Sequence, residues 1–221
     1  MTDRGTPVGW DAILFDLDGT LADTVALILA SYRHTMRTHL GDVPDERRWL
    51  STIGRPLHDQ IRLFARNEDE AGEMLATYVA FQRTIHDEMA RPFPAVGEVV
   101  RELREGGTPL GLVTSKRSGI AERTLECCDL LQHFEVRVCA DHVTHGKPHP
   151  EPVERAMELL SVTRAHRVLF VGDSPYDLEA GRRAGVKTAA ALWGPFPEQV
   201  LLAENPDYLL PDVNGLLAIR P

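Results

Sequence analysis

Short apolar runs recur along this chain, and each has about the length of a buried β-strand. They span residues 12–15, 110–113, 136–140, 168–171 and 188–192. Helical patterns separate them, at residues 95–104, 118–127, 151–160 and 175–184. Strands that are apolar throughout are typical of sheets covered on both faces. Their alternation with helices therefore predicts an α/β fold with a doubly wound, mostly parallel sheet.

One long segment, residues 23–91, interrupts this alternation because it is helical throughout. Its helical stretches are residues 25–39, 56–64 and 69–89. The segment Arg91–Pro94 (RPFP) then forms a stiff return to the strand pattern, since each proline restricts its own backbone and that of the preceding residue. We predict a helical cap domain at residues 23–91, inserted into a core domain that comprises residues 1–22 and 92–221.

Composition limits the classes of partner. With 221 residues, of which 43% are hydrophobic, the chain is long enough for one core with a smaller inserted domain. Its 33 acidic and 24 basic residues give a net charge of -9, which argues against nucleic acid as the main partner. An anionic substrate must therefore be bound by local features such as a metal ion or a few basic side chains.

Cysteine usage and hydropathy bear on the cellular setting. The chain has three cysteines, and the adjacent pair Cys127 and Cys128 is poorly placed to form a disulfide. The segment Met1–Trp10 lacks the apolar stretch of a signal peptide, and no later segment is long and apolar enough to span a membrane. We expect a cytoplasmic protein with no membrane partner.

The strongest local signal is the segment Phe15–Thr24, FDLDGTLADT, which begins at the end of the first apolar run. Asp16 and Asp18 stand at the carboxyl end of the predicted strand, where open α/β sheets bind their ligands. One carboxylate can attack phosphorus while the other moves the leaving-group proton. Gly19 permits a sharp turn away from the strand. Taken alone, the fragment also fits a solvated acidic loop that ends in a glycine turn.

A second pair of carboxylates, Asp173 and Asp177, follows the apolar run 168–171. Together with the first pair, Asp173 can complete an all-oxygen site of the kind that Mg²⁺ prefers. Asp177 has two interpretations. Ser174 has the character of a helix N-cap, so Asp177 either forms a capping pair with it or contributes to the metal site.

Two weaker signals follow other predicted strands. Thr114 and Ser115 end the run 110–113, and hydroxyls there can bind phosphoryl oxygens, although the same pair is an ordinary entry into a helix. Lys147 lies between a glycine and a proline in a loop rich in histidine, and it can balance the acidic cluster. The histidines of this loop do not have the spacing of a closed zinc site.

The order of these signals, Asp-x-Asp, Thr-Ser, Lys and Gly-Asp-x-x-x-Asp, resembles the four motifs of the haloacid dehalogenase superfamily of phosphatases. The helical insertion is similar to its C1 cap. Within the superfamily, FDLDGTLADT, residues 53–59 and residues 145–152 resemble the phosphoglycolate phosphatase group, which includes an inorganic pyrophosphatase. Dehalogenases and phosphonatases are not expected to carry an aspartate at position 18.

The resemblance implies a role for each residue. Asp16 attacks the phosphoryl group, and Asp18 protonates the leaving oxygen and then activates water. Thr114 and Lys147 hold the transferring group and offset its charge. The metal is Mg²⁺, and its expected residues are Asp16, Asp18, Asp173 and Asp177. The expected substrate-binding residues are Gly19, Thr20, Ser115 and Arg55.

The implied activity is hydrolysis of a small, phosphoglycolate-like phosphomonoester through an aspartyl phosphate. Three alternatives remain: an inorganic pyrophosphatase, phosphoryl transfer like that of β-phosphoglucomutase, and a non-catalytic binding protein with the same fold. We expect a small phosphorylated metabolite as the partner and a monomer or homodimer as the assembly. Arg55 stands between Gly54 and Pro56 in the cap, where it either grips an anionic leaving group or is a surface residue at a helix start.

Overall fold

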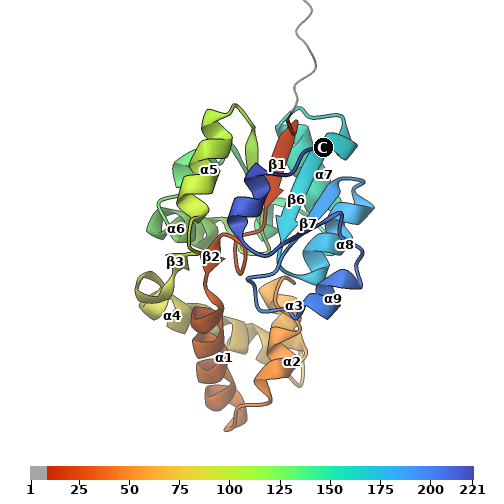
Figure 1. Cartoon of the computed structure of the whole chain (residues 1–221). Helices are drawn as coiled ribbons and strands as arrows, with labels where there is room; N and C mark the ends of the chain where they lie inside the picture. The colour runs from red at the N-terminus through yellow and green to blue at the C-terminus, as the bar shows by residue number, and fades with distance from the viewer. Residues whose placement is uncertain (1–8) are drawn as a thin grey trace, which may run out of the picture.

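The core of the molecule is a six-stranded parallel sheet (Figure 1). A computed structural model describes residues 9–221. The strands are β1 (Ala12–Phe15), β4 (Leu110–Val113), β5 (Val136–Val138), β6 (Val168–Gly172), β7 (Lys187–Ala191) and β8 (Tyr208–Leu210). They lie in the order β5-β4-β1-β6-β7-β8, and each neighbouring pair is parallel. Because the chain winds outward in both directions from β1, the carboxyl end of β1 lies at a switch point, where such sheets bind ligands.

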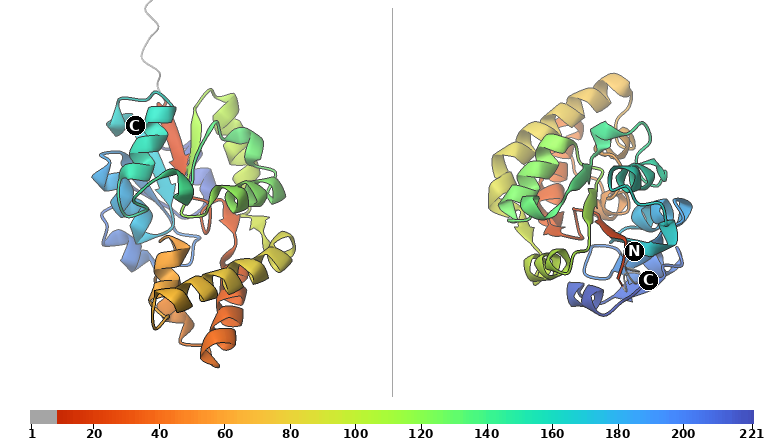
Figure 2. Two further views of the ribbon diagram at one scale, coloured as in Figure 1. Left: turned by 180° about the vertical axis from the view of Figure 1, so that it is seen from behind. Right: turned by 90° about the horizontal axis from the view of Figure 1, so that it is seen from above.

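Side chains of the central strands alternate between two apolar clusters, one on each face of the sheet. Ile13 and Phe15 of β1 belong to a cluster with residues of the helices at 96–105 and 118–127, whereas Ala12 and Leu14 belong to a cluster with residues of the helices at 151–159 and 175–183. Figure 2 shows helices on both sides of the sheet. The helices of this unit are α5 (Val96–Glu105), α6 (Ser118–Cys127), α7 (Glu151–Leu159), α8 (Pro175–Arg183) and α9 (Glu198–Leu202). Burial on both faces explains why the strands are apolar at every position.

Four helices form a second apolar unit at the carboxyl edge of the sheet, below it in Figure 1. They are α1 (Val25–Leu40), α2 (Glu46–Leu50), α3 (Leu57–Arg62) and α4 (Glu68–Met89). Their centre is aromatic: Trp49 stacks on Tyr32 with ring centroids 4.7 Å apart and on Tyr78 at 5.8 Å. The rings come from α1, α2 and α4, so their stacking packs these three helices against one another.

Two very short strands connect the helical unit to the sheet. β2 (Ala22–Asp23) and β3 (Arg91–Pro92) pair antiparallel, so the chain leaves and re-enters the core at one place. We propose this strand pair as the junction between a core domain and a cap domain at residues 23–91. The apolar cluster of the helical unit also includes Leu178 of α8, Ala190 of β7 and Leu201 of α9, so the two units pack against each other away from this junction as well.

The fold class predicted from the sequence is confirmed. β1, β4 and α6 begin and end at the predicted residues, and the other long elements shift by a few residues at their ends. Several short elements are not predicted by the sequence pattern: β8, α2, α9 and the strand pair at the junction. The prediction about a signal peptide lies partly outside the described residues, since residues 1–8 are not among them. Between residues 9 and 221, none of the helices combines the length and the hydropathy needed to cross a bilayer.

Candidate active site

Three carboxylates and one lysine gather at the carboxyl ends of β1 and β6. Asp16 directly follows β1, Asp173 directly follows β6, and Asp177 lies in the first turn of α8. Lys147 reaches them from the loop before α7: its Nζ lies 2.7 Å from Oδ1 of Asp16 and 2.5 Å from Oδ1 of Asp177. All four side chains are buried. The sequence prediction that strand ends would bring these residues together agrees with this geometry.

Burial and mutual repulsion perturb the pKa values of this cluster. Burial raises the pKa of Asp16 to about 7, because Lys147 offsets only part of the cost of burying the charge and Asp177 adds repulsion. Burial and the charges of Asp16 and Asp177 also raise the pKa of Asp173 well above its usual range. Burial alone would lower the pKa of Lys147, but the carboxylates of Asp16 and Asp177 raise it by more. The net pKa of Lys147 is therefore raised, and the lysine stays charged. When all three carboxylates are ionised, the cluster carries more negative charge than its single lysine balances.

A divalent cation fits this excess of negative charge. Asp16, Asp173 and Asp177 offer carboxylate oxygens that lie within 4.8 Å of one another. Oδ1 of Asp173 accepts a hydrogen bond of 2.7 Å from Thr20, whereas its Oδ2 is buried and has no partner among the described residues. An unpartnered buried carboxylate oxygen is costly unless an ion or a water molecule binds it. Carboxylate-only ligation suits a hard ion such as Mg²⁺.

The structure shows the capping pair, which is one of the two interpretations of Asp177 from the sequence. Its Oδ2 accepts hydrogen bonds from the backbone N–H of Ser174 at 3.1 Å and from the Ser174 hydroxyl at 2.5 Å, which forms the capping pair at the start of α8. Its Oδ1 accepts from Lys147. Both oxygens therefore already have donors, in contrast to Asp173, so Asp177 is better suited to orient the cluster than to bind a cation directly.

Two glycines let the backbone approach Asp173 closely. Gly19 has a φ of +85°, and a Cβ built on it would lie 2.4 Å from Oδ2 of Asp173. A Cβ on Gly194 would lie 2.3 Å from Cβ of Asp173. Any larger residue at either position would push against this carboxylate. The sequence pointed to Gly19 as a turn residue, but the contribution of Gly194 appears only in the structure.

Asp18 follows β1 two residues after Asp16 and lines a cavity between the helical unit and the sheet. Lys116 donates a hydrogen bond to its Oδ1, and so does the hydroxyl of Thr24. Neither partner was predicted from the sequence. The proximity of Thr24 within the same segment was the only available signal, because Lys116 lies 98 residues away in the chain. These two donors fix the direction of the Asp18 carboxylate.

The residues after β4 join the core to the cap. Thr114 is buried, and its Oγ1 accepts from the backbone N–H of Lys116 at 3.2 Å. The Ser115 hydroxyl donates to the carbonyl oxygen of Gly54 in the cap at 2.6 Å. Ser115 thus contacts a cap residue, while Thr114 remains next to the strand-end cluster.

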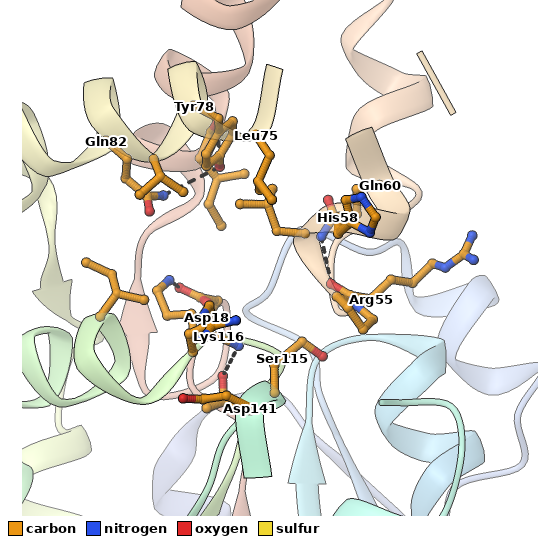
Figure 3. Close-up of a pocket in the computed structure, with 18 of the residues that line it drawn as sticks. Asp18, Arg55, His58, Gln60, Leu75, Tyr78, Gln82, Ser115, Lys116 and Asp141 are labelled. Carbon is orange, nitrogen blue, oxygen red and sulfur yellow. Dashed lines mark hydrogen bonds and ion pairs between the residues drawn. The ribbon is translucent and has the colours of Figure 1, made fainter. Parts of the chain in front are cut away.

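A cavity of about 700 Å³ lies between the two units (Figure 3). Its floor includes Asp16, Asp18 and Lys116, and Leu75, Tyr78 and Gln82 of α4 face them from the cap. Arg55 also lines the cavity, but Figure 3 shows its side chain extending away from Asp18. Its guanidinium lies 5.9 Å from the centroid of the Tyr176 ring.

Comparison with known proteins identifies the family. Residues 13–191 match the family of haloacid dehalogenase-like hydrolases. The pyrophosphatase PpaX of Bacillus cereus strain G9842 is 38% identical over 209 residues, which cover 95% of each chain. A haloacid dehalogenase-like hydrolase of Streptococcus pneumoniae has a TM-score of 0.83 at 24% identity, covering 96% of this chain and 99% of its own. A predicted phosphoglycolate phosphatase of Haemophilus somnus has a TM-score of 0.84 at 22% identity, covering 95% and 97%. With a family match over most of its length and a full-length relative at this identity, the chain belongs to the haloacid dehalogenase-like hydrolases.

Proposed function

We propose that the chain is a magnesium-dependent phosphatase that forms an aspartyl phosphate on Asp16. The observation that carries this proposal is the position of Asp16 at the cavity floor, beside Lys147 and the unpartnered oxygen of Asp173. A carboxylate in such a place can act as a nucleophile toward a phosphoryl group whose charge is balanced around it. A relative named a pyrophosphatase adds support for phosphoryl chemistry.

In the first step, an oxygen of Asp16 forms a bond to phosphorus as the bond from phosphorus to the leaving oxygen breaks. Bound Mg²⁺ would be held by Asp16 and Asp173, and it would offset negative charge on the phosphoryl oxygens. Lys147 supplies a fixed positive charge beside Asp16, and its raised pKa keeps it protonated. The Thr114 hydroxyl, at the cavity edge, can donate to a phosphoryl oxygen.

Asp18 is placed to move protons. It lines the cavity two residues after the nucleophile Asp16. Its carboxyl group can protonate the departing oxygen. In the second step the resulting carboxylate takes a proton from water, which attacks the aspartyl phosphate and releases inorganic phosphate. The contacts with Lys116 and Thr24 hold Asp18 in one orientation for both steps. Lys116 is a positioning residue in this scheme.

Two substrate classes are supported. A phosphoglycolate-like monoester follows from the resemblance, and inorganic pyrophosphate is supported by the name of the Bacillus relative. Both carry an anionic leaving group. Arg83 and Arg117 line the cavity, and neither forms an ion pair within residues 9–221, so cationic side chains are available at its border.

The direct test is a phosphatase assay on p-nitrophenyl phosphate, phosphoglycolate, pyrophosphate and a panel of sugar phosphates. We expect turnover in Mg²⁺, its loss in excess chelator and inhibition by Ca²⁺, which prefers looser coordination. Acid quench with a ³²P-labelled substrate should trap phosphate on the protein. Turnover that persists undiminished in chelator would contradict the metal, and a complete lack of turnover would favour a binding protein with this fold.

A further inference from the structure

The cap contacts the core at two separate places. The cavity between the cap and the core is therefore not the result of an open cap. At one end, Ser115 donates to the carbonyl of Gly54, and the Tyr176 hydroxyl donates to the carbonyl of Ser51 at 2.9 Å. The loop of residues 51–56 therefore rests on the core. A Cβ on Gly54 would lie 2.5 Å from Oγ of Ser174, which shows how close the two surfaces are.

At the other end, α4 of the cap is tied to α6 of the core. Arg123 donates to both carboxylate oxygens of Asp87, at 2.7 and 2.8 Å. The buried His86 ring lies 2.9 Å from the hydroxyl of Thr124. Contacts at both ends of the cap leave little room for further closure without rearranging the backbone.

The docked cap still leaves about 700 Å³ above Asp16 and Asp18. Cavities of about 300–1,000 Å³ are typical of proteins that bury most of a drug-sized ligand. Phosphoglycolate and pyrophosphate are far smaller than such ligands. Either of them would occupy the floor of the cavity and leave the volume under the cap to water.

Apolar side chains form part of the cavity wall away from the floor, alongside Gln60, Gln82 and Arg83. Ile28 of α1, with Leu75, Tyr78 and Val79 of α4, line it from the cap, and Ile120 of α6 lines it from the core. Figure 3 shows Leu75 and Tyr78 directed across the cavity toward Asp18 and Lys116. The Tyr78 hydroxyl donates to the Ile28 carbonyl at 3.4 Å and its ring stacks on Trp49, so this buried residue borders the cavity with little exposed surface. We call these five residues the apolar roof.

We propose that the preferred substrate is a phosphomonoester whose leaving group carries an apolar body, which packs against the apolar roof while the phosphoryl group reaches Asp16. This proposal rests on the phosphatase activity proposed above and names its substrate class. Water on an apolar surface is displaced at a gain that grows with the area covered. An apolar leaving group therefore gains binding energy that neither phosphoglycolate nor pyrophosphate can obtain.

A series of straight-chain alkyl phosphates from ethyl to hexyl tests the proposal. The alcohols released are nearly equal as leaving groups, so differences in kcat/KM report the binding of the chain rather than the chemistry. We expect kcat/KM to rise about two- to fourfold per methylene until the roof is covered. A flat or falling series, with Mg²⁺-dependent hydrolysis of ethyl phosphate intact, overturns the apolar leaving group and leaves the phosphatase standing. If no ester is hydrolysed, both the proposed phosphatase activity and this proposal are wrong.

A substitution in the apolar roof tests whether the roof is the surface that binds the alkyl chain. Val79→Thr keeps the shape of the side chain and replaces one methyl group of the roof with a hydroxyl. We expect the ratio of kcat/KM for hexyl over ethyl phosphate to fall about threefold or more. Val200→Thr is the matched control, because Val200 is exposed on α9 and is not among the residues that line the cavity. A ratio that Val79→Thr leaves unchanged, or that both variants change equally, would overturn the assignment of the roof.

Discussion

The two sides of the cavity are built in different ways. On the core side, Asp16, Lys147 and Asp177 are almost fully buried and bonded to one another. On the cap side, Arg55 and Arg83 line the same cavity but are partly or largely exposed, and neither forms an ion pair among residues 9–221. The side that would hold the transferred group is a fixed network. The side that would face the leaving group consists of separate side chains over an apolar surface.

This difference has an energetic meaning. Removing one member of a buried ion pair leaves an uncompensated charge and costs about 3–5 kcal/mol. Removing an exposed cation costs about 0–1 kcal/mol. Substitutions on the core side should therefore affect every substrate and the fold itself, whereas substitutions on the cap side should change substrate preference and little else. The following experiments test that contrast.

The largest effect is expected at Asp16. Asp16→Asn should lower kcat by several orders of magnitude on every substrate, because a carboxamide has the same shape but is a poor nucleophile. The measurement is kcat on p-nitrophenyl phosphate in Mg²⁺, with circular dichroism to check the fold. Asp69→Asn, at an exposed position early in α4, is the control. Substantial activity in Asp16→Asn would exclude the covalent mechanism.

The next largest effect separates two lysines. Lys147→Ala should lose far more activity than Lys116→Ala, since the Lys147 ammonium lies between two buried carboxylates whereas the Lys116 ammonium is paired with Asp18 alone among the side chains of residues 9–221. Lys147→Met, which keeps the volume of the side chain, serves where the alanine variant does not fold. We expect the Lys147 variants also to unfold at a lower temperature. If Lys116→Ala were the more damaging substitution, the roles of the two lysines would be exchanged.

Magnesium dependence should distinguish Asp173 from Asp177. Asp173→Asn should raise the Mg²⁺ concentration needed for half-maximal activity by about tenfold or more, because it removes charge from the carboxylate with the unpartnered oxygen. Asp177→Asn should raise it less, since both Asp177 oxygens already accept hydrogen bonds. Mg²⁺ titrations of the two variants provide the comparison. Equal increases would make Asp177 a direct ligand.

The pKa of Asp16 predicts how stability depends on pH in the metal-free protein. Between pH 3.8, the usual pKa, and about pH 7, the Asp16 carboxyl is ionised in the unfolded chain but keeps its proton in the folded protein. The folded state therefore binds more protons, and this group makes the stability fall as the pH rises through that range. Mg²⁺ favours the ionised form and should therefore raise the melting temperature more at pH 7.5 than at pH 5. Melting curves in chelator and in Mg²⁺ measure this. In Asp16→Asn, the melting temperature in chelator should fall less steeply with rising pH. A slope identical to that of the unsubstituted protein would mean that other groups cause the fall.

The sequence was informative where chain topology decides the position of a residue. Asp16, Thr114 and Asp173 each follow a predicted parallel strand, and the ends of parallel strands share one edge, so their proximity could be predicted without coordinates. The pairing of Lys116 with Asp18 could not, because it depends on how a loop side chain crosses the cavity. The direction of Arg55 was equally inaccessible. A sequence places Arg55 in the cap loop, but the ring that attracts its guanidinium belongs to Tyr176, 121 residues later.

The smallest effect is expected at Arg55, and it tests the cap side directly. Arg55→Ala should lower kcat/KM on phosphoglycolate, pyrophosphate and p-nitrophenyl phosphate by similar factors of about two to five, which corresponds to the loss of an exposed contact between a cation and a ring. Arg62→Ala, which removes an exposed arginine of α3 paired with Glu68, is the control.

The opposite result has a clear signature. If Arg55 grips an anionic leaving group, the first two substrates should lose about 1.5–3 kcal/mol of transition-state binding while the aryl ester changes little. The side chain would then have to turn from Tyr176 toward Asp18 when substrate binds. Equal small losses would instead make Arg55 part of the contact that docks residues 51–56 on α8, together with the hydrogen bond from Tyr176 to Ser51. In that case the choice of leaving group would depend on the apolar roof and on Arg83 and Arg117, which line the cavity and form no ion pair within residues 9–221.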